Sequence, residues 1–204
     1  MNASRTDSNA RSWFRSANCD ARYGATLLIS VALILALNAT AEWGREALSY
    51  QRQALLHEQW WRLLSGHLVH LDWRHALLNC GGLVVLWALF ARDYSVMRWL
   101  WILTLAALSI DAALWFRYPE VIWYLGASGV LHGAWAAGAL ATWRRGDRMG
   151  ALLLLLLIIK IIYEQRSGMS VFEGELPLVP AAHLFGALGG GLASLVPPAA
   201  VKSL

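Results

Sequence analysis

The amino-acid sequence predicts an all-α membrane protein with six transmembrane helices and an interfacial, helical first loop. Hydrophobic residues make up 58% of the 204 residues and charged residues only 15%, which is outside the usual range of water-soluble globular domains. The apolar residues gather in runs that approach the about 20 residues a helix needs to cross about 30 Å of hydrocarbon. Basic residues stand singly or in pairs between these runs, so they form no stripe for nucleic acid.

Six apolar segments are the candidate spans. They comprise residues 24–41, 75–91, 99–116, 121–143, 149–163 and 176–196. The second and fifth segments are short, so we expect them to use flanking residues or to lie in a locally thinned bilayer. Asp111 and Lys160 fall near the outer ends of their segments, where charged groups can reach the lipid headgroups, and neither is predicted to be catalytic. The outer loop of residues 164–175 carries Glu164, Glu173 and Glu175, and we expect a solvated acidic loop rather than a site for a cationic substrate segment.

The first segment allows two interpretations. A basic leader, an apolar run and the tripeptide Ala-Thr-Ala before Glu42 are typical of a signal peptide with its cleavage site. The alternative is a retained first span, with a tail of residues 1–23 before it. On that alternative, lysines and arginines are more numerous on the side of the two chain ends, which predicts cytoplasmic termini and a cytoplasmic tail of residues 197–204.

The first outer loop, residues 42–74, has the pattern of a surface helix rather than of a linker. Its leucines recur at helical spacing. Trp60, Trp61 and Trp73 are amphipathic rings of the kind that lie at a membrane surface. We therefore expect short helices that lie in the interface.

Polar side chains on three spans fall at one predicted depth. Helical rise places Ser128 and His183 each about 10 Å below the outer ends of their segments, and Asn79 about 12 Å below. His75 precedes Asn79 by one helical turn on the same face. A serine and a histidine at one level supply a nucleophile and a general base, while Asn79, His75 and the Ser128 N–H can stabilise an oxyanion.

Each of these residues also has a structural interpretation. A lone intramembrane serine commonly bonds its own helix, and a lone histidine or asparagine can join two helices. Gly129–Gly133 and Gly186–Gly190 are G-x-x-x-G pairs, which allow the fourth and sixth spans to approach closely.

Three short motifs resemble the signatures of rhomboid intramembrane serine proteases, in the same order. They are HALLN (75–79), GASG (126–129) and AHLFG (182–186), with WWR (60–62) similar to an element of the rhomboid first loop. The resemblance covers residues 24–196 and implies a six-helix protease domain. It implies that Ser128 is the nucleophile and His183 the general base, and that this pair works without a carboxylate. It also implies an oxyanion hole made by Asn79, His75 and the Ser128 N–H. Gly126, Gly129 and Gly186 would support this site.

His132 departs from the common rhomboid pattern, in which a tyrosine stacks on the catalytic histidine. The SGVLHG sequence (128–133) and the glycine-rich last span are similar to the rhombosortase branch. That branch implies a protease of the bacterial inner membrane whose substrates end in a Gly-Gly motif, an apolar helix and a basic tail. Other transmembrane substrates, and resolution of the acyl-enzyme by water or by an amine, stay open.

Two further classes of membrane protein have to be weighed against a protease. Five histidines can suggest a haem- or metal-binding membrane electron carrier, namely His67, His70, His75, His132 and His183. The chain has no H-E-x-x-H motif and no cysteine ligand pair, and ligation would not explain Ser128 or Asn79, so no cofactor or metal is expected. An inactive rhomboid-like binding protein is disfavoured, because Ser128 and His183 are both present. The expected partners are membrane-anchored substrates and the lipid bilayer.

Overall fold

The computed structural model describes residue 18 and residues 21–168 and 179–196, and this part of the chain is mostly helical. Most of the N-terminal tail, all of the C-terminal tail and the expected start of the last span at residue 176 lie outside the described residues. The same holds for Glu173 and Glu175 in the loop that precedes that span.

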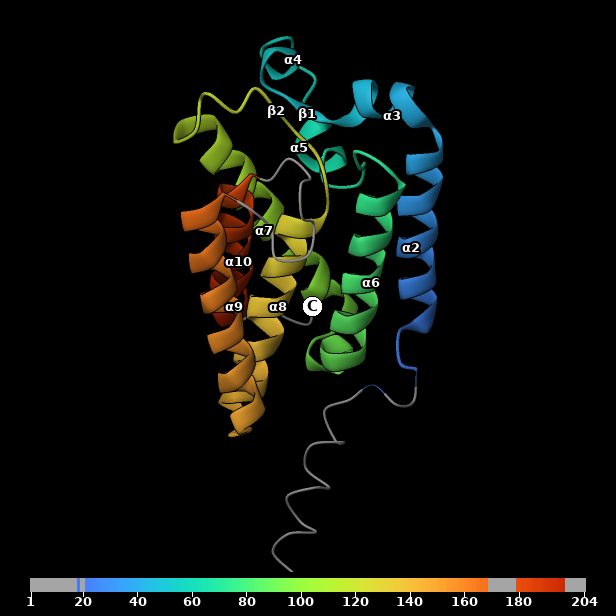
Figure 1. Cartoon of the computed structure of the whole chain (residues 1–204). Coiled ribbons are helices and arrows are strands. Elements are labelled where there is room, and N and C mark those ends of the chain that lie inside the picture. The colour runs from blue at the N-terminus through green and yellow to red at the C-terminus, as the bar shows by residue number, and fades with distance from the viewer. Residues whose placement is uncertain (1–17, 19–20, 169–178, 197–204) are drawn as a thin grey trace, which may run out of the picture.

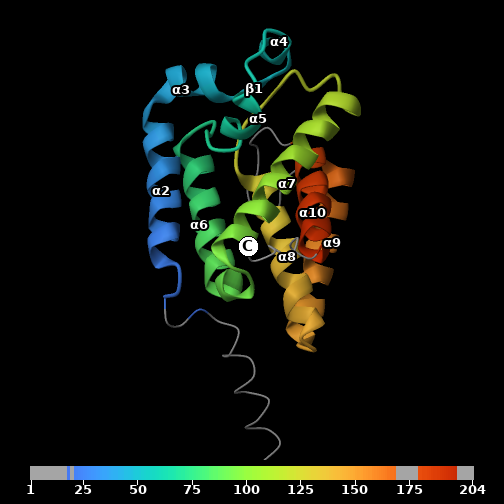
Figure 2. The same ribbon diagram turned by 180° about the vertical axis from the view of Figure 1, so that it is seen from behind.

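The long helices lie side by side. They are α2 (Gly24–Ala39), α6 (Trp73–Phe90), α7 (Val96–Phe116), α8 (Ser128–Arg144), α9 (Arg148–Ser167) and α10 (Pro180–Leu195). Helix α8 is central and contacts α6, α7, α9 and α10, whereas α2 packs on α6 at one side (Figure 1). The view from behind shows α7 and α10 together on the opposite side (Figure 2).

The first loop caps one end of these helices. It contains α3 (Ala41–Leu48), β1 (Tyr50–Gln51), α4 (Arg52–Leu56) and α5 (Arg62–Ser65), so the expected short helices are present. Strand β1 pairs antiparallel with β2 (Trp123–Tyr124), which the sequence analysis did not predict. This pairing attaches the first loop to the segment that leads into α8.

The predicted membrane spans are supported in part by length and composition. Within the described residues, two helical segments are long and apolar enough to cross a membrane, namely Trp73–Asp93 and Val96–Phe116. The first of them consists of α6 and the 3₁₀ turn Ala91–Asp93 that follows it. Helices α2 and α3 make a third if this pair, bent by 106°, is one span. Helices α8 and α10 have 17 and 16 residues, fewer than the about 20 of an ordinary span. Helix α9 carries charged residues within its apolar run.

Two helices differ from the sequence prediction in ways that matter for the site. Residues 121–127 were expected to open the fourth span, but they are not helical and include β2, so α8 begins at Ser128. Helix α10 begins at Pro180, whose fixed φ suits the first position of a helix. Ser128 and His183 therefore lie in the first turns of their helices, and the depths obtained by counting helical rise from residues 121 and 176 do not apply.

Glycine contacts bring α8 and α10 together. A Cβ on Gly129 would lie 2.8 Å from the carbonyl oxygen of Ala182, and a Cβ on Gly133 would lie 2.7 Å from that of Gly186. Any side chain at these positions would force the two backbones apart. The close approach expected from the two G-x-x-x-G pairs is thus present, and it sets the distance across which Ser128 faces His183.

Candidate active site

The turn before α8 is held in place from several sides. Gly126 has a φ of +114°, which a residue with a side chain rarely adopts, and a Cβ there would lie 2.6 Å from Cε1 of the His75 ring. The Gly126 N–H donates to the carbonyl of Gly66 at 2.9 Å, and the Tyr124 hydroxyl donates to the Gly126 carbonyl at 3.0 Å. The backbone that leads into Ser128 is consequently held by contacts to the first loop and to α6.

Ser128 faces His183 across the α8–α10 contact. The Ser128 Oγ lies 2.9 Å from Nε2 of His183, and the histidine side chain is almost fully buried. At this distance the hydroxyl can donate its proton to an unprotonated Nε2. The two residues are thus placed as a nucleophile and a general base require.

A carboxylate lies behind the histidine. Oε2 of Glu164 is 2.8 Å from Nδ1 of His183, and Glu164 is fully buried in α9. The expectation of a pair without a carboxylate is wrong for this structure, as is the assignment of Glu164 to a solvated outer loop. The reason is that α9 continues to Ser167, a full turn beyond the predicted end of the span at residue 163, and so carries Glu164 into the helix bundle.

Lys160 pairs with the same carboxylate. Its ammonium group forms a buried ion pair with Oε1 of Glu164, one helical turn away. The prediction that Lys160 extends to the headgroups is therefore wrong, because its side chain turns inward to a counter-charge. Asp111 is also buried, with Oδ1 3.4 Å from Nε2 of His67, so the same prediction fails there.

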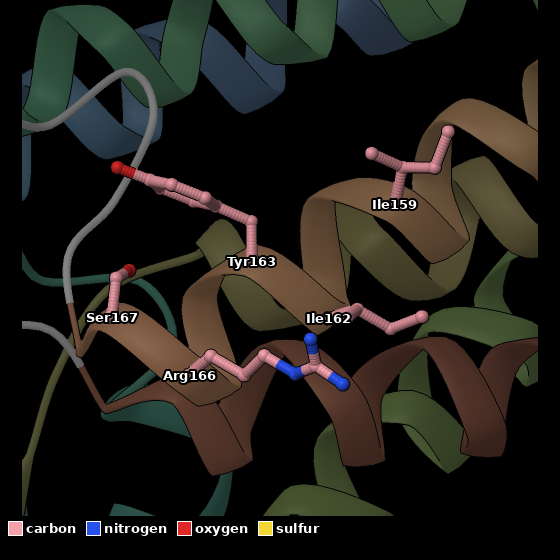
Figure 3. Close-up of a pocket in the computed structure, with 5 residues that line it drawn as sticks. All are labelled: Ile159, Ile162, Tyr163, Arg166 and Ser167. Carbon is pink, nitrogen blue, oxygen red and sulfur yellow. The ribbon is translucent and has the colours of Figure 1, made fainter.

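The opposite side of α9 has a different character. Ile159, Ile162 and Tyr163 are about half exposed and, with Arg166 and Ser167, line a shallow hollow of about 480 Å³ (Figure 3). Large exposed apolar side chains on one side and a buried ion pair on the other are typical of a helix that faces lipid.

His132 stacks on the histidine that faces Ser128. The rings of His132 and His183 are 4.0 Å apart between centroids and nearly parallel, at 13°. Nδ1 of His132 lies 2.7 Å from the carbonyl oxygen of Ser128, and since a carbonyl only accepts, the proton is on Nδ1. His132 thus links the backbone of Ser128 to one face of the His183 ring.

Asn79 and His75 lie on α6 beside this site. Asn79 is buried, and its Nδ2 donates to the His75 carbonyl at 2.9 Å. The Leu71 N–H lies 3.5 Å from Nδ1 of His75, which leaves Nε2 as the protonated nitrogen of that ring. Since the His75 ring also contacts Gly126, α6 brings N–H donors close to the residues that precede Ser128.

The group of His132, Glu164 and His183 does not suit a metal ion. In the described part of the chain, His132, Glu164 and His183 are the one group whose ligand atoms lie within 4.8 Å of one another. Imidazole lone pairs lie in the ring plane, so two stacked, nearly parallel rings cannot both point at one ion. The Lys160 ammonium beside Glu164 would also repel a cation.

A Rhomboid domain model matches residues 57–197, more than half of the chain. The chain belongs to the rhomboid family. Rhomboids are intramembrane serine proteases, so the protein is a serine endopeptidase that acts in the membrane on transmembrane proteins. The matched description covers the family as a whole and does not select the rhombosortase branch. No curated protein matches the chain.

The rhomboid match contains every residue of the candidate site. His75, Asn79, Ser128, His132 and His183 all fall within residues 57–197, whereas helix α2 precedes the matched segment.

Glu164 and Lys160 are the site residues that sequence reasoning missed. The available signal was their spacing, because opposite charges one helical turn apart share one face of a helix.

Proposed function

We propose that Ser128 is the nucleophile and His183 the general base of an intramembrane peptidase that cuts near the outer membrane face. The observation that carries the proposal is the 2.9 Å separation between Ser128 Oγ and His183 Nε2. His183 is buried within the helix bundle, whereas Ser128 is partly exposed, so the proposed base is shielded from solvent and the hydroxyl stays accessible.

The reaction follows from this geometry as an acyl transfer. Ser128 Oγ bonds to the carbonyl carbon of the scissile peptide while its proton passes to His183 Nε2. The C–N bond then breaks, and the same proton goes to the leaving amine. Water then attacks the carbonyl carbon of the Ser128 ester while its proton passes to Nε2. The bond between that carbon and Ser128 Oγ breaks, Oγ takes the proton from Nε2, and the acid is released; an amine in place of water would give a new amide by the same steps.

The oxyanion formed in both steps needs N–H donors. We assign this role to the Ser128 N–H, the Asn79 amide and Nε2 of His75. Ser128 is the first residue of α8, where backbone N–H groups have no partner within the helix and the helix dipole favours negative charge. The Asn79 amide would exchange its bond to the His75 carbonyl for one to the substrate.

We further propose that all six long helices span a bacterial inner membrane, with both chain ends cytoplasmic. Support comes from the side-by-side packing of these helices and from the position of the short helix α8, which contacts α6, α7, α9 and α10. Topology reporters fused after Gly146 should read cytoplasmic and those fused after Gly168 periplasmic. The reverse pattern contradicts the orientation.

For the substrate we propose a protein ending in Gly-Gly, an apolar helix and a basic cluster. Support comes from the similarity of residues 128–133 to the rhombosortase branch. Glycines at the cleavage site also make local unwinding of a substrate helix easy. Rhomboid cleavage of other transmembrane segments is the alternative.

Two experiments test these proposals. A fluorophosphonate probe should label the purified protein at Ser128, and mapping of the label to another residue contradicts the assigned nucleophile. A secreted reporter with the Gly-Gly tail should be cleaved by the wild type and stay intact with Ser128→Ala. Equal cleavage of a reporter whose glycines are replaced by leucines rejects the Gly-Gly substrate while leaving the protease assignment in place.

A further inference from the structure

A chain of polar contacts runs from α9 through α10 to α8 and ends at the candidate nucleophile. Lys160 pairs with Oε1 of Glu164, and Oε2 of Glu164 lies 2.8 Å from Nδ1 of His183. Nε2 of His183 then lies 2.9 Å from Ser128 Oγ. Each group binds the next through a different atom, so one contact does not compete with another.

Resting on the proposed function, we infer that Glu164 is a positioning residue that converts the Ser128–His183 pair into a serine–histidine–glutamate triad, and that Lys160 holds Glu164 ionised. An ionised carboxylate only accepts hydrogen bonds, so it keeps a proton on Nδ1 of His183. Nε2 is then the unprotonated nitrogen and is free to take the Ser128 proton. As His183 becomes positively charged during the reaction, the carboxylate beside it stabilises that charge.

The burial of the ion pair explains why two charged residues are needed. Glu164 is fully buried and Lys160 is 8% exposed, in a helix whose other side is covered with isoleucines. A lone carboxylate at such a position would be protonated or would weaken the fold, because a buried charge is costly without a partner. Lys160 removes that cost through one oxygen and leaves the other for His183.

The face-to-face ring of His132 restricts His183 in a second direction. Glu164 fixes the ring at its edge, and His132 covers one of its faces at 4.0 Å. The two contacts together leave Nε2 pointing at Ser128. Neither contact supplies an atom to the substrate, so their loss affects the rate of the chemical step more than substrate binding.

Kinetics of Glu164→Gln test the inference. Gln offers an N–H as well as a carbonyl, so it can place the proton on the wrong nitrogen of His183. We expect kcat to fall by roughly 10²- to 10⁴-fold, as for loss of the acid in other triads, with KM changed by less than about twofold. The rate of Ser128 labelling by a fluorophosphonate should fall by the same factor. Glu164→Asp, which keeps the carboxylate, should retain more activity, and Glu120→Gln, which neutralises an exposed carboxylate, is the matched control.

A double variant separates positioning from folding. Glu164→Gln alone removes the carboxylate charge that offsets buried Lys160, which lowers Tm, whereas Lys160→Met with Glu164→Gln removes both charges and restores Tm toward the wild type. We expect kcat of the double variant to stay as low as that of Glu164→Gln. Wild-type kcat in either variant overturns the inference. Wild-type cleavage by Ser128→Ala would instead reject the proposed function.

Discussion

Two groups of buried histidines lie in this protein, and they differ in what their nitrogens contact. The Ser128 group contains His132 and His183 with Glu164 and Lys160, and its contacts connect a hydroxyl to a carboxylate. The loop group contains His67 and His70. There, Nε2 of His67 faces Asp111 at 3.4 Å, and Nε2 of His70 accepts from the Ala127 N–H at 3.4 Å.

The comparison shows that burial alone does not place a histidine between a hydroxyl and a carboxylate. Every one of these imidazoles is less than 10% exposed. Only His183 has a nucleophilic oxygen on one nitrogen and a carboxylate on the other. The loop group holds the first loop and the turn before α8 in place, so it acts on the site through the backbone.

The largest expected difference comes from the same substitution in the two groups. His183→Ala removes the proposed base and should lower kcat/KM by at least about 10⁴-fold, since a serine hydroxyl alone is a poor nucleophile. His70→Ala removes one neutral hydrogen bond and should cost about tenfold at most. Cleavage of a transmembrane reporter by both purified variants measures the contrast. Similar losses would mean that the loop group takes part in the chemistry.

Asn79→Ala is expected to have the next largest effect. Asn79 lies on α6, one turn from His75, whose ring contacts His70 at 4.9 Å between centroids, so α6 joins the two groups. Loss of one oxyanion donor typically costs about 10²- to 10³-fold in kcat. Steady-state kinetics should show this fall with little change in KM. A change confined to KM would assign Asn79 to substrate binding instead.

Substitutions of His132 test whether the stacking of its ring on His183 contributes to activity. Aromatic stacking contributes about 0.5–1.5 kcal/mol, so His132→Ala should lower kcat by up to about tenfold. His132→Tyr restores a ring against His183 and should retain more activity. Equal loss in the two variants would favour a hydrogen-bonding role through the contact between Nδ1 and the Ser128 carbonyl.

The smallest expected effect is on the pH dependence of stability, through His70 of the loop group. Burial, and secondarily the neighbouring His75, lowers the pKa of His70 from 6.5 to about 3. The unfolded chain therefore binds one more proton at this residue between about pH 6.5 and pH 3, and stability falls as the pH falls through this range. His70→Gln does not titrate, so its Tm should fall by a few degrees less than that of the wild type between pH 7.5 and pH 5. An equal fall in Tm for the two proteins would contradict the assignment of this pH dependence to His70.

Sequence reasoning reached the residues whose chemistry is visible in short motifs. Ser128, His183 and Asn79 are polar residues in apolar runs, and the G-x-x-x-G pairs indicate which helices meet. It missed Glu164, because the apolar run stops at Tyr163 and a carboxylate after it was assigned to solvent. The helix continues to Ser167, since the Lys160–Glu164 pair offsets the charge of both residues.

The start of α8 was mispredicted for a different reason. Residues 121–127 continue directly into the apolar run of the fourth span and were therefore assigned to its helix, although Val, Ile, Trp and Tyr at 121–124 are residue types that favour strands. Trp123 and Tyr124 pair with β1 from the first loop. A contact between Tyr50 and Tyr124 depends on tertiary packing and not on local pattern. The positive φ of Gly126 then turns the chain into the helix, so that Ser128 stands at its first residue.

The division of the site between α8 and α10 has a consequence for biosynthesis. Ser128 and His183 are 55 positions apart in the chain, so a ribosome adding about 5–20 residues per second completes the second about 3–11 s after the first. On the proposed roles, the nascent chain carries a hydroxyl without its base during that interval and should not cut neighbouring proteins. Proteolytic capacity is then expected to begin when α10 packs against α8, which would keep the newly made enzyme harmless until its helices are assembled.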